Sequence, residues 1–359
     1  MKLLDKYILK KFFKTFIFVV LLLNIIVCVV DYTEKQDDFL KHGLSFGYVF
    51  KEYYVNLFIH WVNTLSPLSI FIAVVFMTAR LASHTEVISI LSNGVSYHRF
   101  LAPYVAGAVL VGIVIFGLIG FAVPNASKTR VAFEIKYLKS PYYFNERDIH
   151  YRVSDSSYLY VETYNNRIKR GYRPTLEVLS GNKLLSKLSA NRIQWDSTKE
   201  EWTFDRYEKY EFKPDGKQTF SKGNSLTMKL NLDPKYFESK YALHETLTNT
   251  ELSEFIEAEK ERGVGNLGVY ENALYERYAY PFAILILTIM GVCVSSVKSR
   301  RGSGYQIAMG FVLAFIYLLM VLMSRAIAEA DTLSPFLAAW LPNIIFFVVT
   351  IYLYFKVQK

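Results

Sequence analysis

Residues 12–30 read Phe12-Phe-Lys-Thr-Phe-Ile-Phe-Val-Val-Leu-Leu-Leu-Asn-Ile-Ile-Val-Cys-Val-Val30, and this stretch decides the fold class. Lys14, near its beginning, is its single charged side chain. About 20 such residues in an α-helix cross the ~30 Å hydrocarbon core of a membrane. In lipid the backbone must satisfy its own hydrogen bonds, so the stretch predicts a transmembrane helix. A core helix of a soluble protein is the alternative, but such a helix keeps a polar face, and this stretch has none.

Further apolar stretches of similar length occur along the 359-residue chain, of which 52% is hydrophobic and 20% is charged. The six expected spans are Phe12–Val30, Leu57–Ala79, Phe100–Val123, Tyr278–Val297, Tyr305–Met323 and Leu337–Phe355. They form two groups of three, separated by a polar segment. We therefore expect residues 1–123 and 278–359 to form an α-helical membrane part, with an extramembrane domain inserted at 124–277.

The net charge of +9 is concentrated beside the expected spans. Basic residues gather before the first span, between the fourth and fifth spans, and at the end of the chain: Lys2, Lys6, Lys10, Lys11, Lys14, Lys298, Arg300, Arg301, Lys356 and Lys359. Six spans put all three clusters on one side, and cytoplasmic loops carry such an excess of lysine and arginine. Both termini are then cytoplasmic, and the loop Asp31–Glu52 and the inserted domain are outside. This distribution argues against binding to nucleic acid.

An alternating pattern begins at Tyr151 and predicts β-strands in the inserted domain. The expected strands are Tyr158–Tyr164, Thr175–Ser180, Leu184–Trp195, Trp202–Phe212 and Ser225–Leu232, with turns at Gly181-Asn182 and Pro214-Asp215-Gly216 and an end at Asp233-Pro234. Short strands separated by turn signals are typical of an antiparallel sandwich or open jelly roll. The capping-box sequence Thr248-Asn-Thr-Glu251 predicts a short return helix at about 249–262. Cys28 and Cys293 lie in expected spans, so the domain is expected to fold without a disulfide.

The motifs for catalysis and cofactor binding do not fit their surroundings. Gly263-Val-Gly265-Asn-Leu-Gly268 matches GxGxxG, but it follows an acidic helix where dinucleotide binding needs a strand. The sequence contains no Walker A motif and no HExxH, and its six histidines lack metal-ligand spacing. We expect no cofactor, no metal and no catalytic residue. Asn24, His60 and Asn63 are polar residues inside spans, and they either bond neighbouring helices or line a substrate path.

A short and largely uncharged segment, Arg80–Ser96, lies between the second and third spans on the expected cytoplasmic side. Val87, Ile90 and Leu91 form an apolar stripe at helical spacing, and Gly94 fits the end of a helix. Such a helix either fills the membrane interface or docks into a groove of a cytosolic partner.

Four short segments carry a resemblance to a known family. They are Leu4-Asp5-Lys6-Tyr7-Ile8; the inside loop with Arg80-Leu81, Glu86 and Ser92-Asn93-Gly94-Val95-Ser96; Glu276-Arg277-Tyr-Ala-Tyr-Pro281; and Leu337-Ala-Ala-Trp340-Leu-Pro342-Asn343. In this order, over a three-plus-three layout with a β insert, they resemble the permease subunits of the lipopolysaccharide-export ABC transporter, the LptF/LptG group. The resemblance covers the whole chain, although the insert matches by architecture and not by motif. The first segment favours LptG.

The resemblance implies a bacterial inner-membrane transporter subunit that is not itself an enzyme. Two different six-helix permeases pair, and a cytosolic ATPase dimer binds their inside helices. ATP-driven closure then moves lipopolysaccharide from the outer leaflet into the periplasmic β-jelly-roll domain, which passes it to a periplasmic bridge protein of the same jelly-roll type. Glu86, with Arg80 and Gly94, would lie in the coupling segment, about 80–96.

The resemblance also implies lipid contacts. Family members have basic residues near the outer end of the first span that contact lipid phosphates, and Lys35 and Lys41 occupy that region here. Arg325, near the outer end of the fifth span, is a similar candidate. A contact between these cations and phosphate is physically reasonable at the membrane interface. Acidic neighbours such as Asp31 and Asp38 are the alternative partners of the two lysines.

An interior formed by the first, second and fifth spans would be apolar and would suit acyl chains of membrane lipid. Its candidate lining residues, which could equally pack between helices, are Phe18, Leu22, Ile25, Phe71 and Phe311. Two other functions compete with lipid export. A secondary transporter or channel could use a helix break at Pro67, but no Asp or Glu lies deep in an expected span. The second competing function is that of an envelope sensor or scaffold with a periplasmic recognition domain.

Overall fold

The computed structural model describes residues 3–139, 147–165, 168–181, 183–197, 199–212, 217–232, 237, 241–261, 267–297 and 303–357. The chain forms two compact units. The helical unit comprises Met1–Phe133, His244–Ser253 and Gly268–Lys359, and the β unit comprises Glu134–Leu243 and Glu254–Leu267. Some features expected from the sequence lie outside the described residues: Lys2, Lys298, Arg300, Arg301 and Lys359, Asn182, Pro214-Asp215-Gly216, Asp233-Pro234 and the glycine motif over 263–266.

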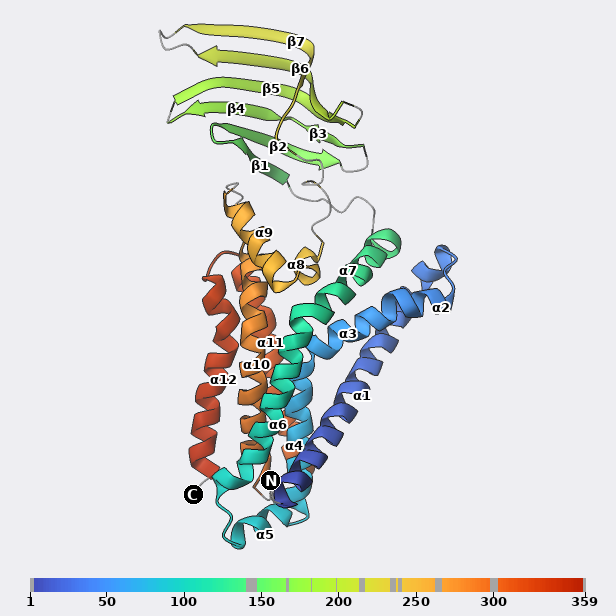
Figure 1. Ribbon diagram of the computed structural model, residues 1–359, viewed down its shortest axis with the longest axis vertical. Helices are drawn as coiled ribbons and strands as arrows, with labels where there is room; N and C mark the ends of the chain where they lie inside the picture. Colours follow the sequence, from blue (N-terminus) through green and yellow to red (C-terminus); the bar gives the residue numbers. More distant parts are fainter. Residues whose placement is uncertain are drawn as a thin grey trace. The chain divides into compact units, whose positions relative to one another are not determined.

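Within the described residues, the helical unit contains six helices that are long and apolar enough to cross a membrane, three before the β unit and three after it. Its elements are α1 (Leu3–Lys41), α2 (Phe46–Val49), η1 (Phe50–Tyr54), α3 (Val55–Thr64), α4 (Ser66–Ser83), α5 (Glu86–Ser92), α6 (Tyr97–Gly117), η2 (Leu118–Ala122), α7 (Val123–Phe133), α10 (Gly268–Ser295), α11 (Ser303–Glu329) and α12 (Pro335–Val357), where η marks a π-helical turn. Both ends of the chain and α5 lie at the same end of this unit (Figure 1).

The segment Asp31–Glu52, expected to be a loop, is instead mostly helical. α1 continues through it to Lys41, and α2 and η1 follow. Lys35 pairs with Asp31 at i,i+4, and Lys41 pairs with Asp38 at i,i+3. Pairs at these spacings stabilise a helix, which explains why α1 extends beyond its apolar part. Gly43 then turns the chain with φ 62°, a backbone conformation that favours glycine.

The second expected span, Leu57–Ala79, is divided into α3 and α4. The two helices meet at Leu65, whose φ of −91° and ψ of 1° are not helical. Pro67, in the first turn of α4, has no N–H and therefore cannot donate the hydrogen bond that would continue α3. The residues around the break are buried: Asn63 is 9% exposed and Ser66 is fully buried.

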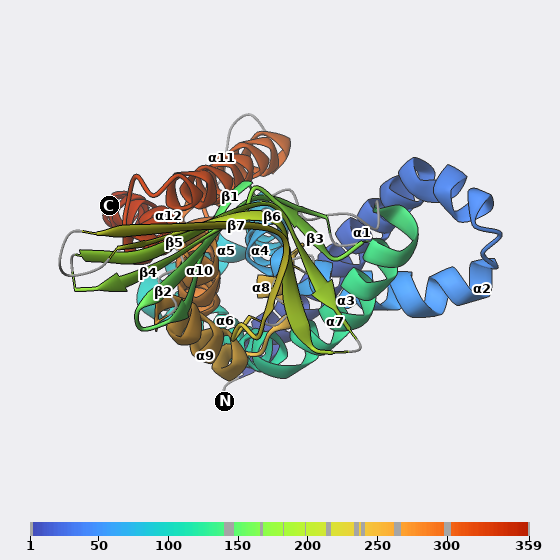
Figure 2. The same ribbon diagram turned by 90° about the horizontal axis from the view of Figure 1, so that it is seen from above.

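α4 is the most buried of the six long helices of the described residues, and it packs against α1, α10 and α11. Gly310 of α11 allows one of these contacts, since a Cβ at this position would lie only 2.7 Å from Cγ1 of Val75. In the apolar window of α4, 72% of the residues are buried, against 17% in α1 and 22% in the fifth span, Gly304–Glu329. α1, α2 and α3 project to one side of the α10–α12 group (Figure 2). The helical unit therefore leaves most of α1 and α11 uncovered.

The third long helix continues beyond residue 124, where the inserted domain was expected to begin. α6, η2, α7 and η3 (Glu134–Leu138) form a continuous helical run from Tyr97 to Leu138. The β unit begins at Glu134, compared with the expected boundary at residue 124. On the return path, α8 (Leu243–Thr246) and α9 (Asn249–Glu261) precede α10.

The β unit is built on one antiparallel sheet. Its strands are β1 (Arg147–Ser154), β2 (Ser157–Asn165), β3 (Arg170–Tyr172), β4 (Thr175–Ser180), β5 (Lys183–Asp196), β6 (Glu201–Phe212) and β7 (Gln218–Met228). The order is β1-β2-β3-β5-β6-β7, and β4 also pairs with β2 and β5. β3 and β4 thus occupy successive parts of one position in the sheet. The expected fold class, a six-helix membrane protein with an inserted antiparallel β domain, is confirmed.

Four of the expected strands fall within β2, β4, β5 and β6 and are confirmed. The fifth, Ser225–Leu232, is displaced, because β7 begins at Gln218 and ends at Met228. Residues 218–224 are mostly polar and do not alternate, so their strand conformation follows from pairing with β6. The register includes Tyr210 opposite Phe220 and Trp202 opposite Met228.

The core of the β unit is aromatic. Trp202 is fully buried, and its ring centroid lies 5.2 Å from that of Trp195. Tyr164 stacks on Phe237, with 3.9 Å between the ring centroids. The indole N–H of Trp202 donates a hydrogen bond of 2.9 Å to the backbone oxygen of Leu232. This bond fixes the segment that follows β7 against the sheet.

Replacing Trp202 with phenylalanine should weaken the β unit locally. The ring would stay apolar, but the buried oxygen of Leu232 would lose its donor, which costs about 1–3 kcal/mol. Hydrogen-exchange mass spectrometry of the whole protein would show faster exchange in peptides covering β6, β7 and Leu232. Trp195→Phe is the control, because Trp195 is only partly buried and makes no bond to Leu232. Equal protection in the two variants would contradict the role given to this bond.

Candidate functional site

The expected coupling segment contains a short helix, α5, between α4 and α6. Thr85, with φ 60°, precedes α5, and Gly94, with φ 81°, follows it. Val87 is 1% exposed and belongs to the helical core, whereas Ile88 is 49% exposed. Arg80 is exposed in the last turn of α4. The segment therefore has one side fixed in the bundle and another apolar side that is uncovered.

An open groove of about 680 Å³ lies beside α5. Its lining comes from α5, the start of α6 and the ends of α10 and α12: Val87, Ile88, Leu91, Val95, Ser96, Tyr97, His98, Ser296, Val297 and Val357. Most of these side chains are apolar or aromatic. A groove of this composition suits docking of a partner element, in the way amphipathic helices bind apolar grooves.

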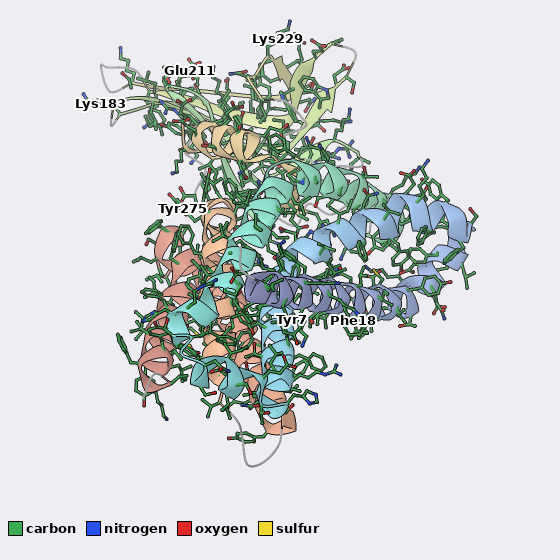
Figure 3. The ribbon with its side chains drawn as sticks, turned by 60° about the horizontal axis from the view of Figure 1, so that its bottom comes forward. Tyr7, Phe18, Lys183, Glu211, Lys229 and Tyr275 are labelled. Atoms are coloured by element: carbon green, nitrogen blue, oxygen red, sulfur yellow. The ribbon has the colours of Figure 1, made fainter. Side chains whose placement is uncertain are left out.

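Glu86 is tied to α1 within the chain itself. The hydroxyl of Tyr7 donates a hydrogen bond of 2.6 Å to Oε2 of Glu86, and Nζ of Lys11 lies 3.4 Å from Oε1. Close by, the guanidinium of Arg99 contacts the Asp5 carboxylate at 2.7 Å. The segment that contains α5 is therefore bonded to the first turns of α1, where Tyr7 lies (Figure 3).

Sequence reasoning did not find Tyr7 and Lys11 as partners of Glu86. Tyr7 belongs to a segment that carries the family resemblance. Lys11 belongs to the basic cluster that predicts the orientation in the membrane. Their i,i+4 spacing puts them on one face of a helix, which was the available signal. Nothing in the sequence gave their distance from Glu86, which is 79 residues away from Tyr7.

The candidate lining residues divide into exposed and buried groups. On α1, Phe18 is 60% exposed, Leu22 46% and Ile25 57%, and their i,i+4,i+7 spacing places them on one face. Phe311 of α11 is 50% exposed. Phe71 of α4 is fully buried among residues of the helical core. The first four therefore offer apolar surface to lipid or to another subunit, whereas Phe71 contributes to packing behind them.

The two lysines toward the C-terminal end of α1 have carboxylate partners. Nζ of Lys35 contacts Asp31 and the hydroxyl of Tyr53, and Tyr54 donates a 3.2 Å hydrogen bond to Asp31. Burial, with a further effect of the Asp31 charge, raises the pKa of the Tyr54 hydroxyl, which therefore stays protonated as a donor. Lys41 is more exposed and lies 3.0 Å from Asp38.

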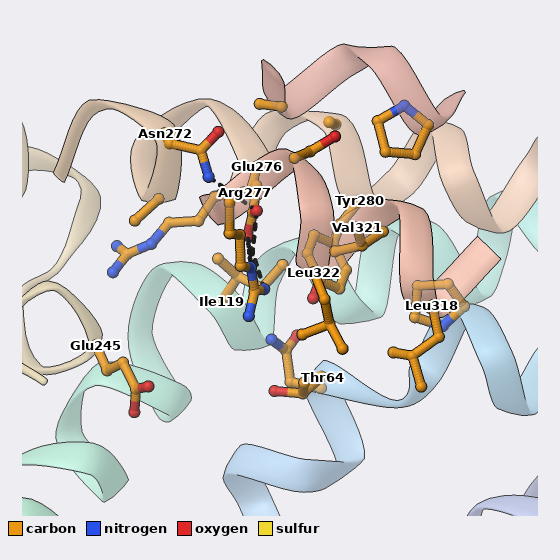
Figure 4. A pocket seen from close by; sticks show the side chains of 18 of the residues that line it. Thr64, Ile119, Glu245, Asn272, Glu276, Arg277, Tyr280, Leu318, Val321 and Leu322 are labelled. Atoms are coloured by element: carbon orange, nitrogen blue, oxygen red, sulfur yellow. Dashed lines mark hydrogen bonds and ion pairs between the residues drawn. The ribbon is translucent and has the colours of Figure 1, made fainter. Parts of the chain in front are cut away.

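Arg325 is held by Glu276, so α10 and α11 are joined by an ion pair. Its guanidinium makes a two-pronged contact with that carboxylate, at 2.8 Å from Nε to Oε1 and 2.7 Å from Nη2 to Oε2. Asn272 donates a further hydrogen bond of 2.9 Å to Oε1 (Figure 4). Glu276 is 9% exposed. In the sequence, Glu276 belongs to a family-like segment and Arg325 lies near the end of an expected span, but nothing there predicts their contact.

Two basic residues of α7, Lys128 and Arg130, also have acidic partners within the helical unit. Lys128 lies 3.3 Å from the Glu251 carboxylate, and Arg130 contacts Glu245. Glu251 itself closes a capping box, because it accepts from the N–H of Thr248 at 2.8 Å. Among the described residues, no group of three or more His, Cys, Asp or Glu side chains is arranged to hold a metal ion.

Comparison with known proteins gives one match that spans almost the whole chain. Residues 6–356 match the family described as lipopolysaccharide export system permease LptF/LptG. A search of curated proteins gave no match. Six apolar helices and an inserted antiparallel β domain agree with that family assignment. The chain therefore belongs to the LptF/LptG family of lipopolysaccharide export system permeases, whose members are multi-pass inner-membrane transporter subunits and not catalysts.

Proposed function

We propose that this chain is one of two permeases in an ATP-driven complex that extracts lipopolysaccharide from the outer leaflet of the inner membrane. The uncovered apolar faces of α1 and α11 support this proposal most directly. Phe18, Leu22, Ile25 and Phe311 present a surface that a second permease and the acyl chains of the lipid would bury between them. Removing such surface from water or from a polar headgroup region is favourable in proportion to its area.

In this mechanism a cytosolic ATPase dimer docks on α5 and its groove. Closure of the ATPase moves α5, and Glu86 transmits the movement to Tyr7 and Lys11 of α1. The cavity between the two permeases narrows, and lipid is expelled toward the β unit. Basic residues gather near the ends of the chain, at the same end of the bundle as α5, and that distribution favours a cytoplasmic location for both termini. The β unit is then periplasmic and passes lipid to a bridge protein.

Lipid phosphates would be met at the outer end of the cavity. Lys41 is the best supported of the three candidates, because an exposed pair such as Lys41–Asp38 contributes only about 0–1 kcal/mol and exchanges its partner easily. Lys35 and Arg325 would have to share their charge between a carboxylate of the chain and the phosphate. The segment Leu4-Asp5-Lys6-Tyr7-Ile8 near the start of the chain leads us to keep LptG as the expected type.

Copurification tests this proposal. In a mild detergent, a second six-helix permease and a cytosolic ATPase should accompany the chain. Ile88→Glu places a charge on the uncovered side of α5 and should release the ATPase while the second permease stays bound. Phe220→Glu is the matched control, because Phe220 in β7 is also 49% exposed, and both partners should remain. Recovery of the chain alone or as a homodimer would contradict the proposal.

A further inference from the structure

A partly open cavity of about 530 Å³ lies between helices of the helical unit, and its lining includes Leu322, an exposed residue of α11. Its lining comes from α3, α4, η2, α7, α8, α10, α11 and α12. The break between α3 and α4 opens onto it, since Thr64, Leu65 and Pro67 are among the lining residues. Interrupted helices in membrane proteins are tolerated where they line such a cavity and often form binding sites.

The lining is apolar in one part and polar in another. The apolar part includes Leu68, Ile119, Leu318, Val321 and Leu322. The polar part is formed around the ion pair of Glu276 and Arg325, with Asn63, Asn272, His244, Glu245 and Arg277. Figure 4 shows Thr64, Leu318, Val321 and Leu322 near one another and Asn272, Glu276 and Arg277 together on α10. Such a lining suits an amphiphile, whose headgroup and chain need different surroundings.

The charges of the lining residues do not favour an ion. Three arginines, Arg130, Arg277 and Arg325, face three glutamates, Glu245, Glu276 and Glu329. Arg277 donates to neutral oxygens, Oδ1 of Asn249 at 2.8 Å and the backbone oxygen of His244 at 2.6 Å. Burial lowers the pKa of His244, which therefore adds no positive charge near neutral pH. A ligand without net charge fits this balance.

Two side-chain amides of the lining are buried and can each accept a further hydrogen bond. Asn272 is 3% exposed and Asn63 is 9% exposed, and the side-chain oxygen of each has no hydrogen-bond partner. Both residues line the cavity. A buried acceptor without a partner is destabilising, so a ligand that brings hydrogen-bond donors is stabilised here. Hydroxyl groups supply donors without adding charge.

We propose that this cavity binds the uncharged, hydroxyl-bearing headgroup of an amphiphile, with hydroxyls donating to Oδ1 of Asn63 and Oδ1 of Asn272. The headgroup lies beside the Glu276–Arg325 pair, and the first part of its chain lies against Leu68, Leu318 and Leu322. The hydroxyls belong either to a sugar, as in a glycolipid, or to glycerol, as in a glycerolipid. The site lies within one permease and does not require the second subunit or the ATPase.

A thermal-shift titration tests the proposal on the full chain with its copurifying subunits, in a detergent without hydroxyl groups such as lauryldimethylamine oxide. Dodecyl glucoside supplies sugar hydroxyls, 1-monododecanoylglycerol supplies glycerol hydroxyls, and methyl dodecanoate is the hydroxyl-free control. We expect a saturable rise in Tm with one or both hydroxyl probes and none with the ester. The probe that acts at the lower concentration identifies the source of the hydroxyls.

Two leucine variants separate binding from folding. Asn63→Leu removes an unpartnered acceptor at similar side-chain size, so it should not lower the Tm measured without probe by much. Asn272→Leu also removes the hydrogen bond to Glu276, so it should lower that Tm, and its probe titration is read against its own Tm without probe. Each should raise the half-saturating concentration of the probe about tenfold, the effect of losing roughly 1.4 kcal/mol. Asn125→Leu, at an exposed position outside the cavity lining, should respond as the unmodified chain does.

Three results would overturn the proposal: no saturable shift with either hydroxyl probe, which would mean that the cavity holds water alone; an equal shift with the ester; or unchanged titrations in both Asn63→Leu and Asn272→Leu. None of these results depends on ATP hydrolysis or on lipid release. The export function proposed above would therefore stand even if the cavity proposal failed.

Discussion

Arg325→Leu should destabilise the helical unit by on the order of 3 kcal/mol, because it leaves the Glu276 carboxylate buried without its cation. Glu276 would keep its hydrogen bond from Asn272, which carries no charge. The expected result is a clear drop in Tm of the purified protein. The double variant Glu276→Leu/Arg325→Leu should recover much of the loss, because it removes both charges and leaves apolar side chains between α10 and α11.

Lys41→Leu is the control for this experiment. It also removes a cation from an ion pair, but Lys41 and Asp38 have side chains that are 71% and 42% exposed, against 37% and 11% for Arg325 and Glu276. Its cost should stay below about 1 kcal/mol. If Arg325→Leu melted at the same temperature as Lys41→Leu, or if the double variant were the least stable of the set, the pair would not be the buried link that its geometry indicates.

Glu86→Lys should abolish lipid release while ATP hydrolysis by the partner continues, if α5 couples the two. The substitution reverses the charge that faces Lys11 and removes the acceptor of Tyr7. Folding should be preserved, because the ion pair with Lys11 is partly exposed and worth about 0–1 kcal/mol. The rates of lipopolysaccharide release from proteoliposomes and of phosphate production should be measured on one preparation. The ratio of the two rates shows whether lipid release is still coupled to ATP hydrolysis.

Tyr7→Phe distinguishes two ways in which Glu86 could act. This variant removes the intramolecular hydrogen bond but leaves the Glu86 carboxylate available to a partner. If Glu86 works through α1, Tyr7→Phe should reduce lipid release per ATP hydrolysed in the same direction as Glu86→Lys. If Glu86 works only by binding the ATPase, Tyr7→Phe should match the unmodified protein. Unchanged coupling in Glu86→Lys itself would remove α5 from the coupling mechanism.

The sequence predicted the six spans and most of the sheet for a simple physical reason. Spans and alternating strands are local patterns, and a stretch such as Phe12–Val30 has few alternatives in any environment. The sequence indicated a possible helix break at Pro67, close to the break observed at Leu65. It could not make the break certain, because proline is also tolerated within helices when neighbours supply the missing hydrogen bonds. The helical extension of α1 to Lys41 was missed, since its polar residues resemble a loop until their i,i+4 pairing is considered.

The site residues were harder to predict because they depend on which helix faces which. Phe71 and Phe18 have the same chemistry, yet α4 is surrounded by other helices and α1 is not, so Phe71 is fully buried and Phe18 is 60% exposed. The Glu276–Arg325 pair needs the relative register of α10 and α11. The link from Glu86 to Tyr7 joins residues far apart in the chain. Such contacts leave no recognisable pattern in a single sequence, whereas the composition of each helix can be read from it directly.

The continuous first helix has a mechanical consequence. α1 has 39 residues, and at 1.5 Å per residue it is a rod about 58 Å long. One end is bonded to Glu86, and the other is bonded through Asp31 and Lys35 to Tyr53 and Tyr54. For each degree that such a rod tilts about its inner end, its far end moves by about 1 Å. A tilt of a few degrees at the end bonded to Glu86 would therefore displace the end near Tyr53 and Tyr54 by several ångströms.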